Sequence, residues 1–156
     1  MMHTWFECKV RYEKTLENGM NKKVTEPYLV DALSFTEAEA RIIEEVSPYI
    51  SGEFTIADIK RANYTELFFC EEDSADRWFK CKLTFISLDE KSGAEKKTSS
   101  NVLVQAADLR DAVKKLDEGM KGSMADYIIA SVAETAIMDV YPYTEGPNDK
   151  PEFPEA

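Results

Sequence analysis

Two tryptophans, each followed at short spacing by cations, are the residues of this chain whose types and spacing could do chemistry. Trp5 precedes Lys9 and Arg11, and Trp78 precedes Lys82 in a closely similar segment. On a strand with alternating side chains, each tryptophan shares a face with its cations. An aromatic ring beside cations on a sheet can stack a nucleobase and contact its phosphate. We therefore predict an outward-facing basic and aromatic surface in each half of the chain.

Lysines one strand further along extend both surfaces. The complete predicted binding set is Trp5, Lys9, Arg11, Lys22, Lys23, Trp78, Lys82, Lys96 and Lys97. A second interpretation is that the same residues have a structural role and bind no ligand. Hairpin lysines often protect sheet edges, and a tryptophan at a strand start often closes one end of a core. The sequence leaves both interpretations open.

The charge of the chain bears on its partners. Its 156 residues carry a formal net charge of -11, and a protein that coats phosphate backbones needs clustered lysine and arginine instead. We therefore expect an unknown protein partner or self-association, with nucleic acid as the less favoured partner. No run of apolar residues is long enough to span a membrane, and residues 1–5 do not resemble a signal peptide. A cytoplasmic protein without a membrane partner is expected.

The residues that usually carry catalysis are scarce. The chain has one histidine, His3, and three cysteines, Cys8, Cys70 and Cys81. The cysteines lack the spacing of metal ligands, and two of them lie among apolar neighbours, so we expect reduced thiols. No glycine-rich phosphate loop or nucleophile motif is present. We predict no catalytic residue, no metal site and no cofactor.

The segment that begins at Trp5 occurs twice. Residues 5–12 read WFECKVRY, and residues 78–85 read WFKCKLTF. Further matches follow in the same order, including two helix starts, at Ser34 and Asp108, that each place an acid three residues later. We therefore predict that a unit of about 73 residues is written twice.

The elements that must position these residues follow from periodicity. Alternating apolar residues, a turn with glycine and a second alternating run predict a hairpin at the start of each copy. A three- and four-residue apolar repeat then predicts a helix. In the first copy these elements are residues 6–12, 22–32 and 35–50, with two strands within 53–69. In the second they are 78–88, 96–106 and 109–120, with two strands within 127–143. The predicted class is α+β, an internal duplication of a β-β-α-β-β unit with pseudo-two-fold symmetry, antiparallel sheets and one helix per unit.

A unit of this size with a single helix would be only marginally stable alone, because the helix covers only one face of its sheet. We therefore predict one compact body over residues 1–143, made of repeats 4–70 and 77–143. The acidic connector 70–76 is expected to be a solvated turn between them. The acidic, proline-containing residues 144–156 are predicted to form a disordered or extended tail.

Three segments carry a resemblance to a known family. WFxCK at residues 5–9, KKVTEPYLVDALSFTEAEAR at 22–41 and DIKRA at 58–62 resemble a small, uncharacterised domain-of-unknown-function family of gut anaerobic bacteria and their phages or prophages. The resemblance covers residues 5–143. It implies a bacterial cytoplasm and a phage-associated role, and it supplies no catalytic residues.

Two hypotheses about function follow. The first is a non-enzymatic protein-interaction or accessory module. The alternative is a single-stranded nucleic-acid-binding protein that uses the two basic and aromatic hairpins. From Tyr64 onward the predicted order of strands and helix is similar to the repeat of Whirly and Pur-type binders, which supports the alternative by analogy of fold alone.

Overall fold

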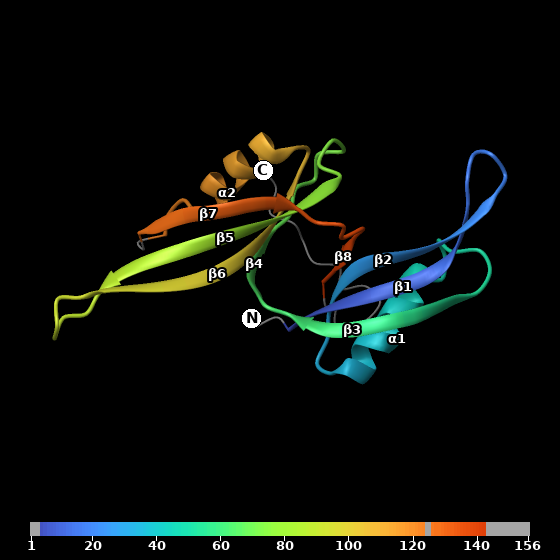
Figure 1. The fold of residues 1–156 in the computed structure, drawn as a ribbon, viewed down its shortest axis with the longest axis horizontal. Helices are drawn as coiled ribbons and strands as arrows, with labels where there is room; N and C mark the ends of the chain where they lie inside the picture. The colour runs from blue at the N-terminus through green and yellow to red at the C-terminus, as the bar shows by residue number, and fades with distance from the viewer. Residues whose placement is uncertain (1–3, 124–125, 143–156) are drawn as a thin grey trace. The chain divides into compact units, whose positions relative to one another are not determined.

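The protein, described by a computed structural model over residues 4–123 and 126–142, divides into two compact units. Unit 1 comprises Met1–Ala62 and Ala136–Ala156, and unit 2 comprises Asn63–Thr135. The chain therefore leaves unit 1 after residue 62 and returns to it after residue 135. Each unit holds one four-stranded sheet and one helix (Figure 1).

Unit 1 is built on a long hairpin. Its elements are β1 (Trp5–Thr15), β2 (Asn21–Asp31), α1 (Phe35–Val46), β3 (Phe54–Ala62) and β8 (Val140–Tyr141). The strand order is β3-β1-β2-β8. β1 pairs antiparallel with β2 and β3, while β8 runs parallel to β2. Gly19 allows the tight turn of this hairpin because its φ of 82° suits glycine alone.

Unit 2 has the same kind of sheet. Its elements are β4 (Tyr64–Phe68), β5 (Arg77–Leu88), β6 (Glu95–Ala106), α2 (Leu109–Gly119) and β7 (Tyr127–Glu134). The strand order is β4-β6-β5-β7. β5 pairs antiparallel with β6 and β7, and β4 runs parallel to β6.

The α+β class, with two mainly antiparallel sheets and two helices, is confirmed. The sheets are not purely antiparallel, however, so that part of the prediction needs correction. β4 follows β3 in the chain but does not turn back on it. Instead, the chain crosses into unit 2, where β4 runs parallel to β6, and β8 does the same on β2 of unit 1. The predicted repeats 4–70 and 77–143 therefore do not coincide with the two units, and residues 144–156 lie outside the described residues.

The two parallel edge strands pair in equivalent registers. Leu67 and Phe68 of β4 lie opposite Leu103 and Val104. In unit 1, the Cα partners of Val140 and Tyr141 are Leu29 and Val30. Leu29-Val30 and Leu103-Val104 occupy the same place in the two hairpins, so each sheet accepts its edge strand at the same position.

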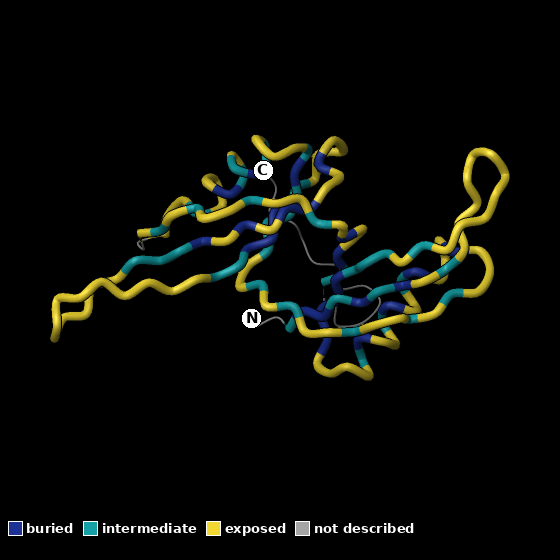
Figure 2. The backbone as a smooth tube through the Cα atoms, in the orientation of Figure 1, coloured by how far each residue is buried: buried dark blue, intermediate teal, exposed yellow. Residues whose placement is uncertain are grey.

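Each helix packs on one face of its sheet. In unit 1, α1 buries Ala38, Ile42 and Val46 among the apolar residues of β1 and β2. In unit 2, α2 buries Ala112 and Leu116 among those of β5 and β6. Figure 2 shows the buried segments on the strands and helices, whereas the turns at the ends of both hairpins are exposed. Within residues 4–123 and 126–142, neither helix is long and apolar enough to cross a membrane.

Side-chain caps begin both helices, as predicted from their sequences. The Ser34 hydroxyl accepts a hydrogen bond from the Glu37 backbone N–H at 3.1 Å. The Asp108 carboxylate accepts one from the Asp111 N–H at 2.8 Å. Each bond satisfies a backbone donor that has no partner within the helix.

Candidate binding surfaces

The predicted binding residues are distributed over both faces of the two sheets. We call the face opposite the helix the helix-free face of each sheet. In unit 1 it carries Lys9, Arg11 and Lys23, whereas Lys22 lies on the other face opposite Lys14. In unit 2 the helix-free face carries Lys82 and Lys97, and Lys96 lies on the other face. The strands therefore bring together part of each predicted set, and whether these residues bind a ligand stays a prediction.

The two tryptophans do lie on the helix-free faces, but the expectation that they point outward is wrong. The exposed fraction is 5% for Trp5 and 3% for Trp78. Leu29 and Leu103, on the same faces, are fully buried. The Trp78 ring makes an edge contact with the Phe69 ring, at 5.5 Å between centroids. Buried rings offer no stacking platform to a base.

The charges on the helix-free face of unit 1 are balanced along the central strand. Glu7 forms an ion pair with Lys60 of β3, with 3.2 Å between the Glu7 carboxylate oxygen and the Lys60 Nζ. Lys9 lies opposite Asp58 of the same strand. The cations of this face thus alternate with acids, and the face has no single sign of charge along its centre.

The equivalent face of unit 2 carries lysines without opposing acids. Lys80 lies between Leu103 and Ala133, and Lys82 lies between Asn101 and Ser131. Both lysine side chains are exposed. With Lys97 they form what we call the lysine face, and no ion pair joins its members to any residue in the described ranges. Alternation already places Lys80 on the face of Trp78 and Lys82, although Lys80 was not among the predicted binding residues.

A bulge interrupts the pairing at the repeated lysine in both sheets. The β1–β3 register shifts between Lys9 and Val10, and the β5–β7 register shifts between Lys82 and Leu83. Bulges redirect neighbouring side chains and bend a strand. The lysine that ends the WFxCK motif thus lies beside a bulge at the equivalent position of both sheets.

An open cavity of about 620 Å³ lies in unit 1. It is bounded by the free end of the β1–β2 hairpin and by the segment that joins α1 to β3, which lie at one end of unit 1 in Figure 1. The lining residues are Arg11, Tyr12, Glu13, Thr15, Asn21, Lys23, Ser51, Gly52, Glu53, Phe54 and Thr55. The cavity thus contains Arg11 and Lys23 from the predicted binding set. Sequence reasoning missed its acids, because nothing local relates residue 53 to residue 13.

One side chain of this cavity is held by a hydrogen bond to a neighbouring strand. The Tyr12 hydroxyl donates to Glu26 at 2.7 Å. This bond to a carboxylate, together with burial, raises the pKa of Tyr12 to about 12. Tyr12 is therefore a neutral, fixed part of the cavity at physiological pH.

Four exposed apolar residues lie on α1 or just beyond its two ends. The α1 patch, as we call it, consists of Leu33, Phe35, Ile43 and Tyr49, whose exposed fractions are 80%, 52%, 40% and 82%. Phe35 is partly anchored, because its ring contacts the Phe6 ring at 4.9 Å between centroids. The acids Glu39 and Glu44 lie among these positions on exposed parts of the helix, and Glu37 is half-buried in its first turn. This surface is apolar and acidic.

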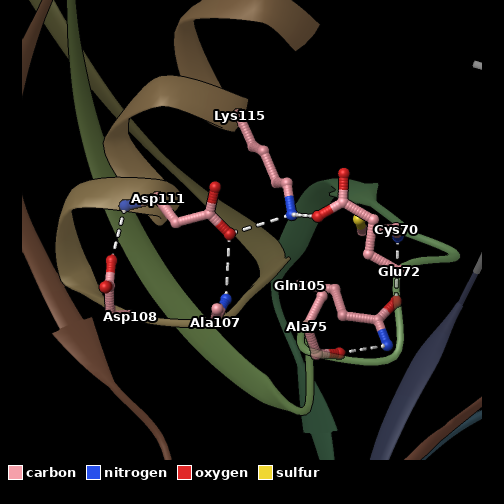
Figure 3. Close-up of polar contacts among 8 residues, drawn as sticks. All are labelled: Cys70, Glu72, Ala75, Gln105, Ala107, Asp108, Asp111 and Lys115. Carbon is pink, nitrogen blue, oxygen red and sulfur yellow. Dashed lines mark hydrogen bonds and ion pairs between the residues drawn. The ribbon is translucent and has the colours of Figure 1, made fainter.

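The acidic connector between β4 and β5 is an exposed turn, as expected, but it lies within unit 2 rather than between the two halves, and polar contacts tie it to that unit (Figure 3). The Gln105 side chain accepts from the Cys70 N–H at 2.9 Å and donates to the Ala75 carbonyl at 3.0 Å. Ala75 itself is buried. The acids of the connector are exposed to solvent, and one of them, Glu72, also forms an ion pair with α2.

Lys115 of α2 joins the same network (Figure 3). Its Nζ lies 2.9 Å from an Asp111 carboxylate oxygen and 3.6 Å from one of Glu72. Partial burial acts to lower the pKa of Lys115, but the Cys70 side chain and the Asp111 carboxylate outweigh it and raise that pKa above its ordinary value. The lysine therefore holds the connector against the helix as a permanent cation.

Arg41 occupies the equivalent turn of α1. Its guanidinium donates to the carbonyl of Asp31 and, at 3.0 Å, to the carbonyl of Pro142, directly after β8. In each unit, a cation of the helix thus contacts the chain just beyond the parallel edge strand. These contacts support a structural role for both cations.

The fold defines an α+β protein with two four-stranded mixed sheets, each covered by one helix. No group of three or more metal-ligating side chains occurs within the part of the chain that the structure describes. Residues 4–143 match the family described as "Domain of unknown function (DUF4494)", and the chain belongs to that family. No curated protein and no solved structure matches the chain.

Proposed function

We propose that this protein is a non-enzymatic protein-interaction or accessory module, and that the α1 patch contacts its partner. The observation that supports this proposal is the number of exposed apolar residues on α1 and beside its two ends. Ten large hydrophobic side chains are exposed within the described ranges, and four of them belong to the α1 patch. Single exposed apolar residues are normal, but a group of them at one element is typical of an interaction site.

Charge favours a partner with a basic, partly apolar surface. Glu37, Glu39 and Glu44 lie among the apolar residues of the patch, and the whole chain carries a net charge of -11. Opposite charge steers the encounter of two proteins, and burial of apolar groups then stabilises the complex. A basic partner would use both.

A matched pair of variants tests this proposal. The patch variant is Leu33→Ser with Ile43→Ser and Tyr49→Ser, because these side chains are exposed and Phe35 is anchored. The control is Leu88→Ser with Leu109→Ser and Ile128→Ser, which removes exposed apolar residues elsewhere. Tagged proteins are used to recover a partner from host lysate, and the purified partner is then titrated over a range of salt concentrations. We expect binding by the wild type and the control, loss in the patch variant, and weakening with salt.

Equal recovery by the patch variant would show that the patch is not the interface. Binding that is insensitive to salt would contradict the basic partner. Circular dichroism of all three proteins checks that each is folded.

A second candidate function is supported by the lysine face of unit 2. Lys80, Lys82 and Lys97 lie among uncharged residues on one sheet face, which is an arrangement that can track the backbone of a single strand. The buried tryptophans and the acidic net charge make this candidate the weaker of the two. Substitution of Trp5 and Trp78 cannot test it, since loss of buried rings would perturb the fold.

The lysines themselves provide the test. Affinity for oligo-dT is measured at low and moderate salt for the wild type, for Lys80→Ala with Lys82→Ala, and for Lys91→Ala with Lys121→Ala. The second pair changes the net charge equally but lies in exposed turns. The candidate predicts that only the first pair weakens binding and reduces its salt dependence. No binding by the wild type at low salt, or equal effects of the two pairs, would exclude it.

We also infer that the two halves arose by duplication of a β-β-α-β-β unit. The order of elements repeats along the chain. The helix caps, the bulge after the repeated lysine and the register of the parallel edge strand all recur at equivalent positions. Unrelated halves would have no reason to agree in all three features.

The setting that we propose for this module is a bacterial cytoplasm, with a role encoded by a phage or prophage. The sequence segments that resemble the gut-anaerobe family support this setting. Fluorescence microscopy of the tagged protein in its host would test the compartment, and accumulation at the membrane would contradict it.

A further inference from the structure

We infer that the open cavity of unit 1 binds a short peptide through its free, oppositely charged ends. This site is separate from the α1 patch and from the lysine face. It combines three features: a volume suited to a small ligand, charges of both signs and two aromatic residues in its lining. The volume of about 620 Å³ is within the range of ligand-binding cavities.

The charges of the cavity are not used by the fold. Its lining includes two cations, Arg11 and Lys23, and two acids, Glu13 and Glu53. None of the four makes an ion pair with any residue in the described ranges, although Glu13 and Lys23 lie opposite each other on β1 and β2. All four side chains are exposed to the cavity or to solvent, so they are available to a ligand.

The second half of the chain serves as an internal comparison. At the positions equivalent to Arg11 and Glu13 in the hairpin, unit 2 has Thr84 and Ile86. The sheet of unit 2 forms with these uncharged residues in the same register. The arginine and the first glutamate are therefore not required by the hairpin, which favours a role specific to unit 1.

The positions of the charges indicate the chemistry of the ligand. The Arg11 Nε donates to Thr25 Oγ1 at 3.4 Å, which leaves the outer nitrogens of the guanidinium for a carboxylate. Glu53 stands in the segment that forms the opposite wall, where it can accept from an ammonium group. A ligand with one sign of charge would meet repulsion from either the acids or the cations. A molecule that carries both signs avoids this repulsion.

The size of the cavity and the aromatic residues in its lining point to a peptide. Tyr12 and Phe54 are paired neighbours of β1 and β3, are partly buried against the core of unit 1, and both line the cavity. A single amino acid would leave most of about 620 Å³ unfilled. A tripeptide with a central aromatic side chain offers a carboxylate, an ammonium and a ring.

Two peptides that differ only in their end groups test the inference. The 15N-labelled protein is titrated with Gly-Phe-Gly, which has free ends, and with acetyl-Gly-Phe-Gly-amide, which has none. We expect saturable shifts of the backbone amides of Glu13, Gly52 and Glu53 with the free peptide, and none with the blocked peptide. The same shifts with both peptides, or no saturation by the free peptide up to about 10 mM, would overturn the inference.

Charge-removing variants locate the two contacts. Arg11→Gln and Glu53→Gln should each weaken the affinity for the free peptide by about tenfold or more, since each removes a charge-assisted hydrogen bond. Lys14→Gln is the matched control, because Lys14 lies on the other face of the same hairpin. Equal affinity of all three variants for the free peptide would show that the cavity does not bind the charged ends of the peptide through Arg11 and Glu53. The amide spectra of the free variants report whether the fold is intact.

Discussion

At the scale of single residues, burial separates the three free cysteines. Cys8 and Cys81 are completely buried. Burial raises the pKa of Cys8 to about 12, with a further contribution from Glu7, and burial raises the pKa of Cys81 to about 11. Cys70 is only half-buried, in the connector. The predicted buried thiols of the WFxCK motif are thus part of the packing.

This difference predicts the order of thiol reactivity. In the native protein at about pH 8, iodoacetamide should modify Cys70, because it reacts with exposed thiolates. Cys8 and Cys81 should react only after unfolding in denaturant. Mass spectrometry of the digested protein gives the extent of modification at each site. Modification of Cys8 before Cys70 would contradict the described packing.

Asp111 predicts a dependence of stability on pH. Hydrogen bonds from the Ala107 N–H and from Lys115 hold the pKa of its carboxyl below the usual value. The resulting stabilisation is fully present above the unfolded pKa of about 3.9 and is lost as the pH falls through the lower folded pKa. Asp111→Asn should therefore lower the free energy of unfolding by about 1 kcal/mol at neutral pH, and by less in acid.

Urea unfolding at pH 7 and at about pH 3 measures the two differences. Glu118→Gln, on an exposed position of α2, is the control and should change the free energy of unfolding by less than about 0.5 kcal/mol. A difference between the wild type and Asp111→Asn that stays constant or grows in acid would refute the proposed linkage.

At the scale of elements, alternation and capping predict most of the strands and both helices. The two strands predicted within residues 53–69 separate after Ala62, which is the place where the chain leaves unit 1. The pairing of β4 and β8 could not be predicted, because Leu29-Val30 and Leu103-Val104 offer them nearly identical edges. Local pattern carries no information about which of two equivalent edges a strand joins.

The binding surfaces, too, could be predicted only in part from local sequence patterns. Alternation placed Trp5 and Trp78 on the correct sheet faces, but it could not show that those faces are covered at the strand starts. The cavity of unit 1 depends on Glu53 and Arg11, which are far apart in sequence. Surfaces of this kind depend on tertiary packing, so single-strand patterns do not identify them.

The packing of α2 on β4 gives a prediction at this scale. A Cβ atom added at Gly119 would lie 2.8 Å from ring carbons of Phe68. Overpacking of this kind costs about 1–3 kcal/mol, whereas alanine gains up to about 1 kcal/mol over glycine in a helix. Gly119→Ala should therefore lower the free energy of unfolding by about 1 kcal/mol.

A double-mutant cycle in chemical denaturation checks the cause. In a Phe68→Leu background the added methyl group has room, so Gly119→Ala should become neutral or stabilising. An unchanged cost in both backgrounds would mean that α2 and β4 do not pack as described.

At the scale of the whole molecule, the edge strands link the two halves of the sequence. β4 follows the first hairpin and helix in the chain but completes the sheet of unit 2, and β8 follows the second set and completes the sheet of unit 1. Neither sheet is complete without a strand from the other half. This reciprocal exchange of edge strands defines both units and follows the same register in each.

Backbone nuclear Overhauser effects in the full-length 15N- and 13C-labelled protein distinguish the exchanged arrangement from its alternative. Parallel pairing brings backbone protons of neighbouring strands close together. The exchanged arrangement predicts contacts between residues near Leu67 and Leu103, and between residues near Val140 and Leu29. Backbone contacts of Leu67 with Leu29, and of Val140 with Leu103, would instead show that each half keeps its own last strand.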